Sequence, residues 1–126
     1  IETLILPDEQ DQIERELIRL SDGRQADLII TTGGTGFAKR DRTPEATLAV
    51  AERIAPGIAE AMRMESMKIT GRAMLSRAVS AIRGNTLIVN LPGSVKAVEE
   101  NLGFVIPQLE HGIRILNGTA KECGRR

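Results

Sequence analysis

Two aliphatic runs constrain the fold of this chain more than any other feature. Residues 27–31 and 86–91 are rich in leucine, isoleucine and valine, and neither run clearly alternates apolar with polar residues. Such runs are typical of strands that are buried on both faces, as in a parallel sheet. Each run ends in a special turn, at residues 32–36 and at residues 92–94. We therefore predict two strands, each followed by a loop at its carboxyl end.

The segment after Pro7 has the pattern of an amphipathic helix. Apolar residues recur at helical intervals between charged ones, at Ile13, Leu17 and Leu20. Asp8 stands where an N-cap residue would, and the Ser-Asp-Gly sequence at residues 21–23 is a helix stop. Ahead of this helix, residues 1–6 read as a strand that is already under way. The first part of the chain is thus predicted as strand, helix, strand.

Further helices are predicted in the middle and at the end of the chain. Residues 43 to about 54 begin with Thr-Pro-Glu, which is a typical helix start, and residues 58–67 continue as a second helix. Ser94 can cap the last helical segment. Because proline interrupts helices, we expect a break near Gly103 and a new helix over residues 107–116.

Residues 78–82 form a short apolar piece before a turn at residues 83–85, which predicts a hairpin or an isolated strand. Strands that alternate with helical patterns indicate α/β architecture with a mostly parallel sheet. The chain has 126 residues, of which 41% are hydrophobic, and this is the size of one ordinary domain. We therefore predict one α/β domain over residues 1–126.

Composition excludes several classes of function. Lys plus Arg and Asp plus Glu number 17 each, and only two residues are aromatic, which disfavours nucleic acid as a partner. No apolar stretch is long enough to span a membrane. The single cysteine, Cys123, agrees with a reducing compartment, so we expect a cytoplasmic location. The four methionines read as core or interface packing, and an aromatic-poor core favours association into an oligomer.

The loops at the strand ends are the best place for a binding site. Ligands of open α/β sheets bind beyond the carboxyl ends of the strands. Three loops qualify, at residues 7–9, 33–41 and 92–94, and parallel strands would bring them to one edge. The glycines at positions 33, 34 and 36 let the backbone approach a ligand closely, and the neighbouring hydroxyls of Thr32 and Thr35 add donors. The alternative is a plain tight turn.

Three side chains near these loops could take part in chemistry. Asp41 lies between Arg40 and Arg42 and could hold Mg²⁺, which prefers one or two carboxylates plus phosphate oxygens; alternatively it belongs to a solvated charge cluster. Asp8 could act in the same way or only cap a helix. Ser76 could contact a ligand phosphate or only cap a turn. For Asp8 and Asp41, a functional role is favoured because each falls on a loop at the same predicted edge.

The same residues resemble a known family. Residues 27–38 and 40–47 closely match the signature of the molybdopterin-binding, molybdopterin adenylyltransferase family, which includes MogA, MoaB and the G domain of gephyrin. The resemblance extends from residue 6 to about residue 116. Further matches occur in order at residues 6–9, 56–57, 74–77, 82–84 and 90–94.

The resemblance implies a three-layer α/β/α fold, a trimer or hexamer, and transfer of AMP from ATP to the terminal phosphate of molybdopterin with release of pyrophosphate. It implies roles in catalysis and in Mg²⁺ binding for Asp8 and Asp41. The substrate would supply its own nucleophile, a phosphate oxygen, so no Ser-His-Asp set is needed. The residues implied to line the molybdopterin and nucleotide pocket are Thr32, Gly33, Gly34, Thr35, Gly36, Ser76, Pro92, Gly93 and Ser94.

One departure from the family keeps a second function open. Family members normally begin with another strand and a Ser-Asp loop, and we expect this chain to lack both. That expectation favours a non-catalytic molybdopterin-binding or oligomerisation module, whereas the presence of Asp8 and Asp41 favours the enzyme. The related molybdate insertase shares the fold, but its glycine loop is followed by a serine- and valine-containing sequence rather than the Thr-Pro-Glu-Ala found here.

Overall fold

The protein has a mixed sheet with helices on both faces. The computed structural model describes residues 1–118, so Cys123 lies outside the described residues. Within them the sheet has four strands in the order β1 (Leu28–Thr32), β4 (Thr86–Leu91), β3 (Ser80–Arg83) and β2 (Arg53–Ile54). β1 pairs with β4 in parallel, whereas β3 is antiparallel to both β4 and β2. The predicted α/β class is confirmed.

The sheet differs from the mostly parallel one that we predicted. Three strands run in one direction, but β3 runs against them, and only one of the pairings in residues 1–118 is parallel. The reason is the tight turn at Gly84, where φ is +57° and the chain folds straight back from β3 into β4. The hairpin alternative that the sequence left open at this point is therefore the correct one.

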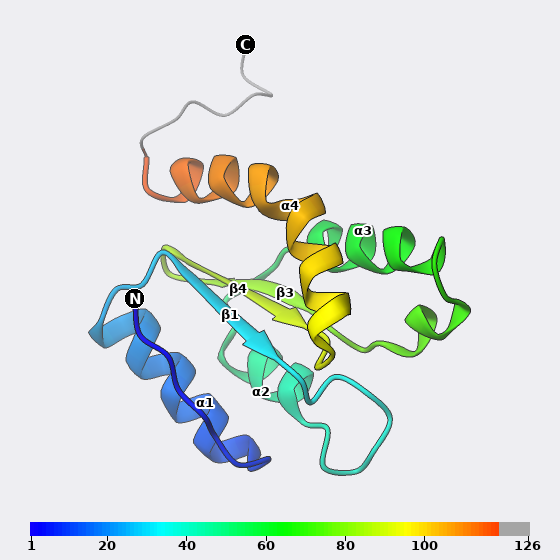
Figure 1. The fold of residues 1–126 in the computed structure, drawn as a ribbon. Helices are drawn as coiled ribbons and strands as arrows, with labels where there is room; N and C mark the ends of the chain where they lie inside the picture. Colours follow the sequence, from blue (N-terminus) through cyan, green and yellow to red (C-terminus); the bar gives the residue numbers. More distant parts are fainter. Residues whose placement is uncertain (119–126) are drawn as a thin grey trace.

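One face of the sheet is covered by α1 (Gln10–Ile18) and α2 (Thr43–Val50) (Figure 1). A π-helical turn over Arg19–Gly23 extends α1. The helical segment ends at Gly23, within the stop predicted at residues 21–23. These helices enclose a small core with β1 and β4, made of Ile13, Leu17, Ile29, Ala46, Val50 and Ile88.

The opposite face is covered by α3 (Pro56–Met67) and α4 (Val95–Leu116) (Figure 1). The second core lies beneath them and consists of Ala59, Met62, Leu87, Val89, Leu91, Val105 and Leu109. All six residues of β4 are buried, because this strand lies between the two helical layers. The three-layer arrangement implied by the resemblance is confirmed.

The predicted break in the last helix is wrong. α4 continues through Pro107, and Figure 1 shows its two halves running in different directions. A proline inside a helix removes a hydrogen bond and costs about 3 kcal/mol. Val105 and Leu109, on either side of the proline, are both 3% exposed in the same core. Their burial, at about 1.5–3 kcal/mol for each large apolar side chain, outweighs the cost of the proline.

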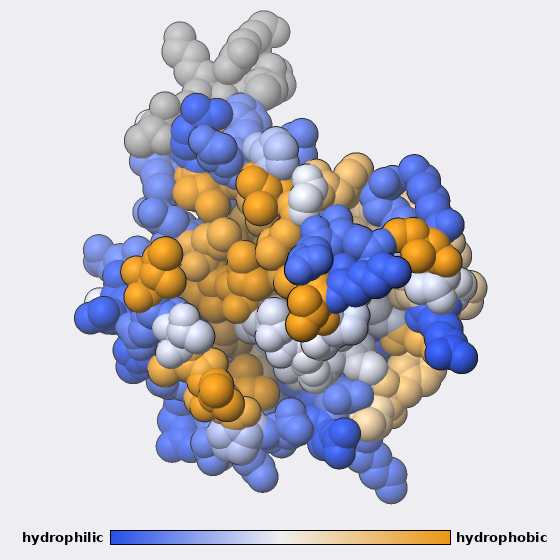
Figure 2. Space-filling view, viewed as in Figure 1, coloured by the Kyte–Doolittle hydropathy of each residue, from blue (hydrophilic) through white to orange (hydrophobic). Residues whose placement is uncertain are grey.

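The strand predicted at residues 1–6 is also wrong. These residues form no strand and are not part of the sheet, because within residues 1–118 β1 is hydrogen-bonded only to β4. The segment is attached instead by Glu2, which forms ion pairs with Arg19 and Arg24. Figure 2 shows apolar residues gathered over β1, between α1 and α4. An apolar sequence is therefore insufficient for a strand when no neighbouring backbone pairs with it.

The helix predicted to run to about residue 54 ends earlier, at Val50. Arg53–Ile54 pair with β3 instead, and the amides of Glu52 and Ala55 donate to carbonyls of that strand. A helical continuation would lose these bonds to an available strand edge. A single turn of 3₁₀ helix, Gly71–Leu75, connects α3 to β3. None of the helices in residues 1–118 has the length and apolar character needed to cross a membrane.

Candidate active site

Two of the predicted loops meet at the carboxyl ends of β1 and β4. Thr32 is paired with Leu91 at the end of the parallel ladder, and the Gly33 amide donates to the Leu91 carbonyl at 3.0 Å. Beyond this bond the backbones of Gly33 and Gly93 touch, since a Cβ added to Gly93 would lie 3.5 Å from the Gly33 Cα. The expected convergence of the glycine loop with residues 92–94 is therefore present.

The glycine loop requires its glycines. Gly33 and Gly34 have φ values of +83° and +69°, in the left-handed region that other residues rarely adopt. A Cβ on Gly34 would lie 2.2 Å from the Thr43 hydroxyl, and one on Gly36 would lie 2.8 Å from Asp41 Oδ2. The loop therefore packs closely against Asp41 and the start of α2. A plain tight turn would not require this packing.

The loop also leaves backbone donors available. In the described part of the chain, the amides of Gly34 and Gly36 donate to no protein acceptor. Thr35 between them is buried, and its carbonyl accepts from the Arg77 amide at 2.8 Å. Glycine amides that are free of internal bonds are the groups with which such loops bind phosphate oxygens.

Asp41 closes a turn at the far end of this loop. Its Oδ2 accepts from the Ala38 amide at 3.0 Å, and its own amide donates to the Ala38 carbonyl at 2.9 Å. Arg42 does not pair with it: that guanidinium donates to Gln10 Oε1 at 2.8 and 3.0 Å. The structure therefore gives Asp41 a defined local geometry, in which its carboxylate is bonded to the loop rather than to Arg42.

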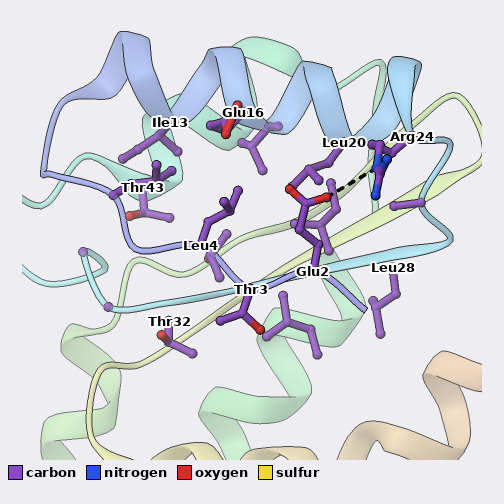
Figure 3. A pocket seen from close by; sticks show the side chains of 18 of the residues that line it. Glu2, Thr3, Leu4, Ile13, Glu16, Leu20, Arg24, Leu28, Thr32 and Thr43 are labelled. Carbon is purple, nitrogen blue, oxygen red and sulfur yellow. Dashed lines mark ion pairs between the residues drawn. The ribbon is translucent and has the colours of Figure 1, made fainter.

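Asp8 is one of the residues that line a cavity between α1, β1 and the N-terminal segment. The cavity has a volume of about 710 Å³, and its lining includes Asp8, Thr32, Gly33, Gly34 and Thr43 (Figure 3). The prediction that Asp8 caps α1 is wrong, because the N-cap is Glu9 and no side chain caps the helix. A turn in which the Glu9 amide donates to the Pro7 carbonyl at 2.8 Å delays the helix start. Asp8 is exposed and lines the same cavity as Gly33 and Gly34 of the glycine loop.

The two serines of the implied pocket have local roles. Ser94 Oγ accepts from the Ala97 amide at 3.1 Å and caps α4, as predicted. Ser76 Oγ accepts from the Ala78 amide at 3.3 Å, which agrees with the capped-turn alternative. Because Gly93 touches Gly33, the capped end of α4 begins beside the glycine loop, and helix N-termini attract anions. Pro92 is half-buried in the same connection.

Arg77 is the residue that the sequence analysis missed. Its Nε donates to the Gly36 carbonyl at 2.8 Å, and its Nη2 donates to the Asp41 carbonyl at 2.5 Å. The same guanidinium grips the Glu45 carboxylate at 2.5 and 3.3 Å. These hydrogen bonds hold the pKa of Glu45 below its usual range and raise the pKa of Arg77. The sequence indicates Glu45 only as an acid in the first turn of a helix, and nothing near it in the sequence indicates an ion pair with Arg77.

The two predicted metal ligands do not line the same cavity. Asp8 borders the cavity whereas Asp41 is not among its lining residues. In residues 1–118 no three His, Cys, Asp or Glu side chains lie close enough together to hold a metal ion. The oxygen donors of Asp8 and Asp41 are nevertheless of the type that Mg²⁺ takes, since that ion needs only one or two carboxylates when phosphates and water complete its shell.

These features define a class of protein: a three-layer α/β domain with an anion-binding loop at the carboxyl edge of its sheet. Residues 1–111 match the family model described as a probable molybdopterin binding domain, and the chain belongs to this family. The resemblance found in the sequence is thereby confirmed.

Individual relatives agree with the family assignment. The chain is 46% identical over 122 residues to a molybdopterin adenylyltransferase of Helicobacter pylori, covering 97% of this chain and 69% of that protein. It is 53% identical over 102 residues to the one of Haemophilus influenzae, covering 81% of this chain and 52% of that protein. The solved structure of the molybdopterin biosynthesis enzyme MoaB from Thermus thermophilus superposes with a TM-score of 0.83 at 48% identity, over 89% of this chain and 70% of that one. The chain spans between 52% and 70% of the length of these relatives.

Proposed function

We propose that this chain carries out the adenylyl transfer for which its relatives are named. AMP would pass from ATP to the terminal phosphate of molybdopterin, with release of pyrophosphate. The observation that carries the proposal is the meeting of the glycine loop with the Pro92–Gly93–Ser94 turn, where free amides and a capped helix N-terminus face one edge. Such an arrangement suits a reaction between two phosphate-bearing substrates.

The chemistry requires little from side chains. An oxygen of the molybdopterin phosphate forms a new bond to the α-phosphorus of ATP, while the bond from that phosphorus to the bridging oxygen breaks. The leaving pyrophosphate keeps the electron pair. The amides of Gly34 and Gly36 and the N-terminus of α4 would hold the phosphates in line. Asp8 and Asp41 would hold Mg²⁺, which when bound neutralises phosphate charge.

The substitution Asp41→Asn tests the proposal. Asparagine keeps an acceptor for the Ala38 amide, so the turn should survive while the carboxylate charge is lost. We expect adenylylated molybdopterin, measured by chromatography, to form at least about 10²-fold more slowly. The matched control is Asp11→Asn, since Asp11 lies on the exposed face of α1 and pairs only with Arg15 there. Equal rates in the two variants would remove Asp41 from the mechanism.

A non-catalytic binding module is the second candidate. It is favoured by two observations: Asp41 does not line the cavity that Asp8 lines, and the described residues hold no group of three His, Cys, Asp or Glu side chains that could bind a metal ion. A titration of molybdopterin, followed by addition of ATP and Mg²⁺, distinguishes the two. Binding without product favours the module, and product that disappears when Mg²⁺ is chelated favours the enzyme.

We also propose that the chain works as a homo-oligomer, a trimer or a hexamer, in the cytoplasm, where ATP is available. Met62 is buried as predicted for a core methionine, but other apolar side chains around α3 and the following turn are exposed. This exposed set suits an interface between subunits, and light scattering after size exclusion would measure the mass. It comprises Met64, Met67, Ile69, Met74 and Leu75.

A further inference from the structure

Arg77 connects three elements that are far apart in the sequence. It precedes β3, it contacts two carbonyls of the glycine loop, and it grips Glu45 in the first turn of α2, 32 residues away. Its backbone amide adds a fourth connection, to the Thr35 carbonyl. Four of the five guanidinium N–H groups that arginine offers are used in these contacts.

The two carbonyls that Arg77 holds lie at the two ends of one segment, residues 36–41. Between them the segment has its own turn, in which Asp41 and Ala38 exchange two bonds. The remaining side chains of the segment, Phe37, Lys39 and Arg40, point to solvent and give it no packed core. The guanidinium therefore supplies the main link between this segment and the rest of the domain.

We propose that Arg77, held in place by Glu45, is a positioning residue that clamps residues 36–41 and so presents Asp41 to the substrates. This inference rests on the proposed adenylyl transfer for the role of Asp41. We assign Arg77 no substrate contact, because four of its five N–H donors are occupied by the protein. The planar guanidinium is essential, since the compact ammonium of a lysine cannot reach two carbonyls and a carboxylate together.

The test compares Arg77→Gln with the matched control Arg83→Gln. Arg83 also grips a carboxylate, that of Asp22 at 2.8 and 3.1 Å, and also donates to a carbonyl, that of Val50 at 2.9 Å, but it lies away from the glycine loop. The two variants should therefore lose comparable thermal stability. Only Arg77→Gln should release residues 36–41.

Trypsin measures the release without any need for activity. Lys39 and Arg40 are exposed cleavage sites inside the clamped segment. Mass spectrometry of the fragments should show cleavage there at least about tenfold faster in Arg77→Gln than in the native chain, because local opening exposes the backbone. Arg83→Gln should leave that rate unchanged. Equal rates at Lys39 and Arg40 in the two variants would overturn the clamp.

Kinetics then measure the consequence. In Arg77→Gln, kcat should fall at least about tenfold, KM for molybdopterin should change less than about threefold, and the Mg²⁺ concentration for half-maximal rate should rise.

If Arg77→Gln fails to fold, Arg77→Lys and Glu45→Gln should show the same changes in weaker form. A native chain without activity would refute the proposed function but leave the trypsin result decisive. An active native chain with equal kcat in Arg77→Gln and Arg83→Gln would refute the positioning role.

Discussion

The fit of Gly34 against Thr43 allows a stability prediction. Replacing Gly34 with alanine forces a side chain into a left-handed backbone at φ +69°, which costs about 1–2 kcal/mol. The new Cβ would also lie 2.2 Å from the Thr43 hydroxyl and 3.2 Å from its Cβ. The Thr43 side chain is buried, and because it is β-branched it has few rotamers to move into. Relieving the overlap therefore costs about 1–3 kcal/mol more.

The opposing effect is small. Alanine reduces the entropy of the unfolded chain and so recovers about 0.4–1 kcal/mol. The net expectation for Gly34→Ala is a loss of about 1–4.5 kcal/mol in the free energy of unfolding, centred on about 3 kcal/mol. Urea unfolding followed by far-ultraviolet circular dichroism measures it, at one fixed protein concentration because association contributes to stability.

Two controls separate the parts of this cost. Gly84 has φ +57° with open space around its missing Cβ, so Gly84→Ala should lose only about 1 kcal/mol. Thr43→Ala removes the hydroxyl, so the double variant with Gly34→Ala should be more stable by about 1 kcal/mol than the sum of the single changes predicts. Equal losses for Gly34→Ala and Gly84→Ala, together with additivity in the double variant, would refute the steric argument.

Three further expectations concern the fold and its pH dependence. Asn90 is fully buried and makes three side-chain hydrogen bonds, so Asn90→Ala should lose about 2–4 kcal/mol in urea unfolding. The pKa of Glu45 is lowered by its bond to Arg77, so the pair stabilises the fold above the usual glutamate pKa of about 4.3. That stability is lost as the pH falls through the lowered value, and Glu45→Gln should flatten the dependence in acid titrations of stability. Pro107→Ala restores a helix donor and should raise the unfolding free energy by about 1 kcal/mol or more, and an unchanged midpoint would contradict this.

Elements whose conformation is decided locally were predictable from the sequence. The strand at residues 86–91 and the Ser94 cap of α4 have the predicted boundaries, because an aliphatic run followed by Pro-Gly-Ser leaves few alternatives. The same is true of the glycine loop. Two successive residues with left-handed backbone, at positions 33 and 34, need glycine, so the sequence itself indicates this conformation.

Elements that depend on distant partners were not predictable. Residues 1–6 have the composition of a strand but are not hydrogen-bonded to β1, whereas Arg53–Ile54 form a strand because β3 lies beside them. Both outcomes are decided by backbone pairing, which local composition does not encode. The course of α4 through Pro107 likewise depends on core residues on both sides of the proline.

The candidate site likewise combines features that are decided locally with one contact between residues far apart in the sequence. Glycines and Asp41 could be found locally, but the ion pair that holds them could not. Glu45 belongs to the family-like segment at residues 40–47, and Arg77 belongs to the separate one at residues 74–77. Their contact at 2.5 Å shows that these segments form one structural unit around the glycine loop. If Arg77 clamps that loop as proposed, the two motifs occur together because neither can present Asp41 without the other.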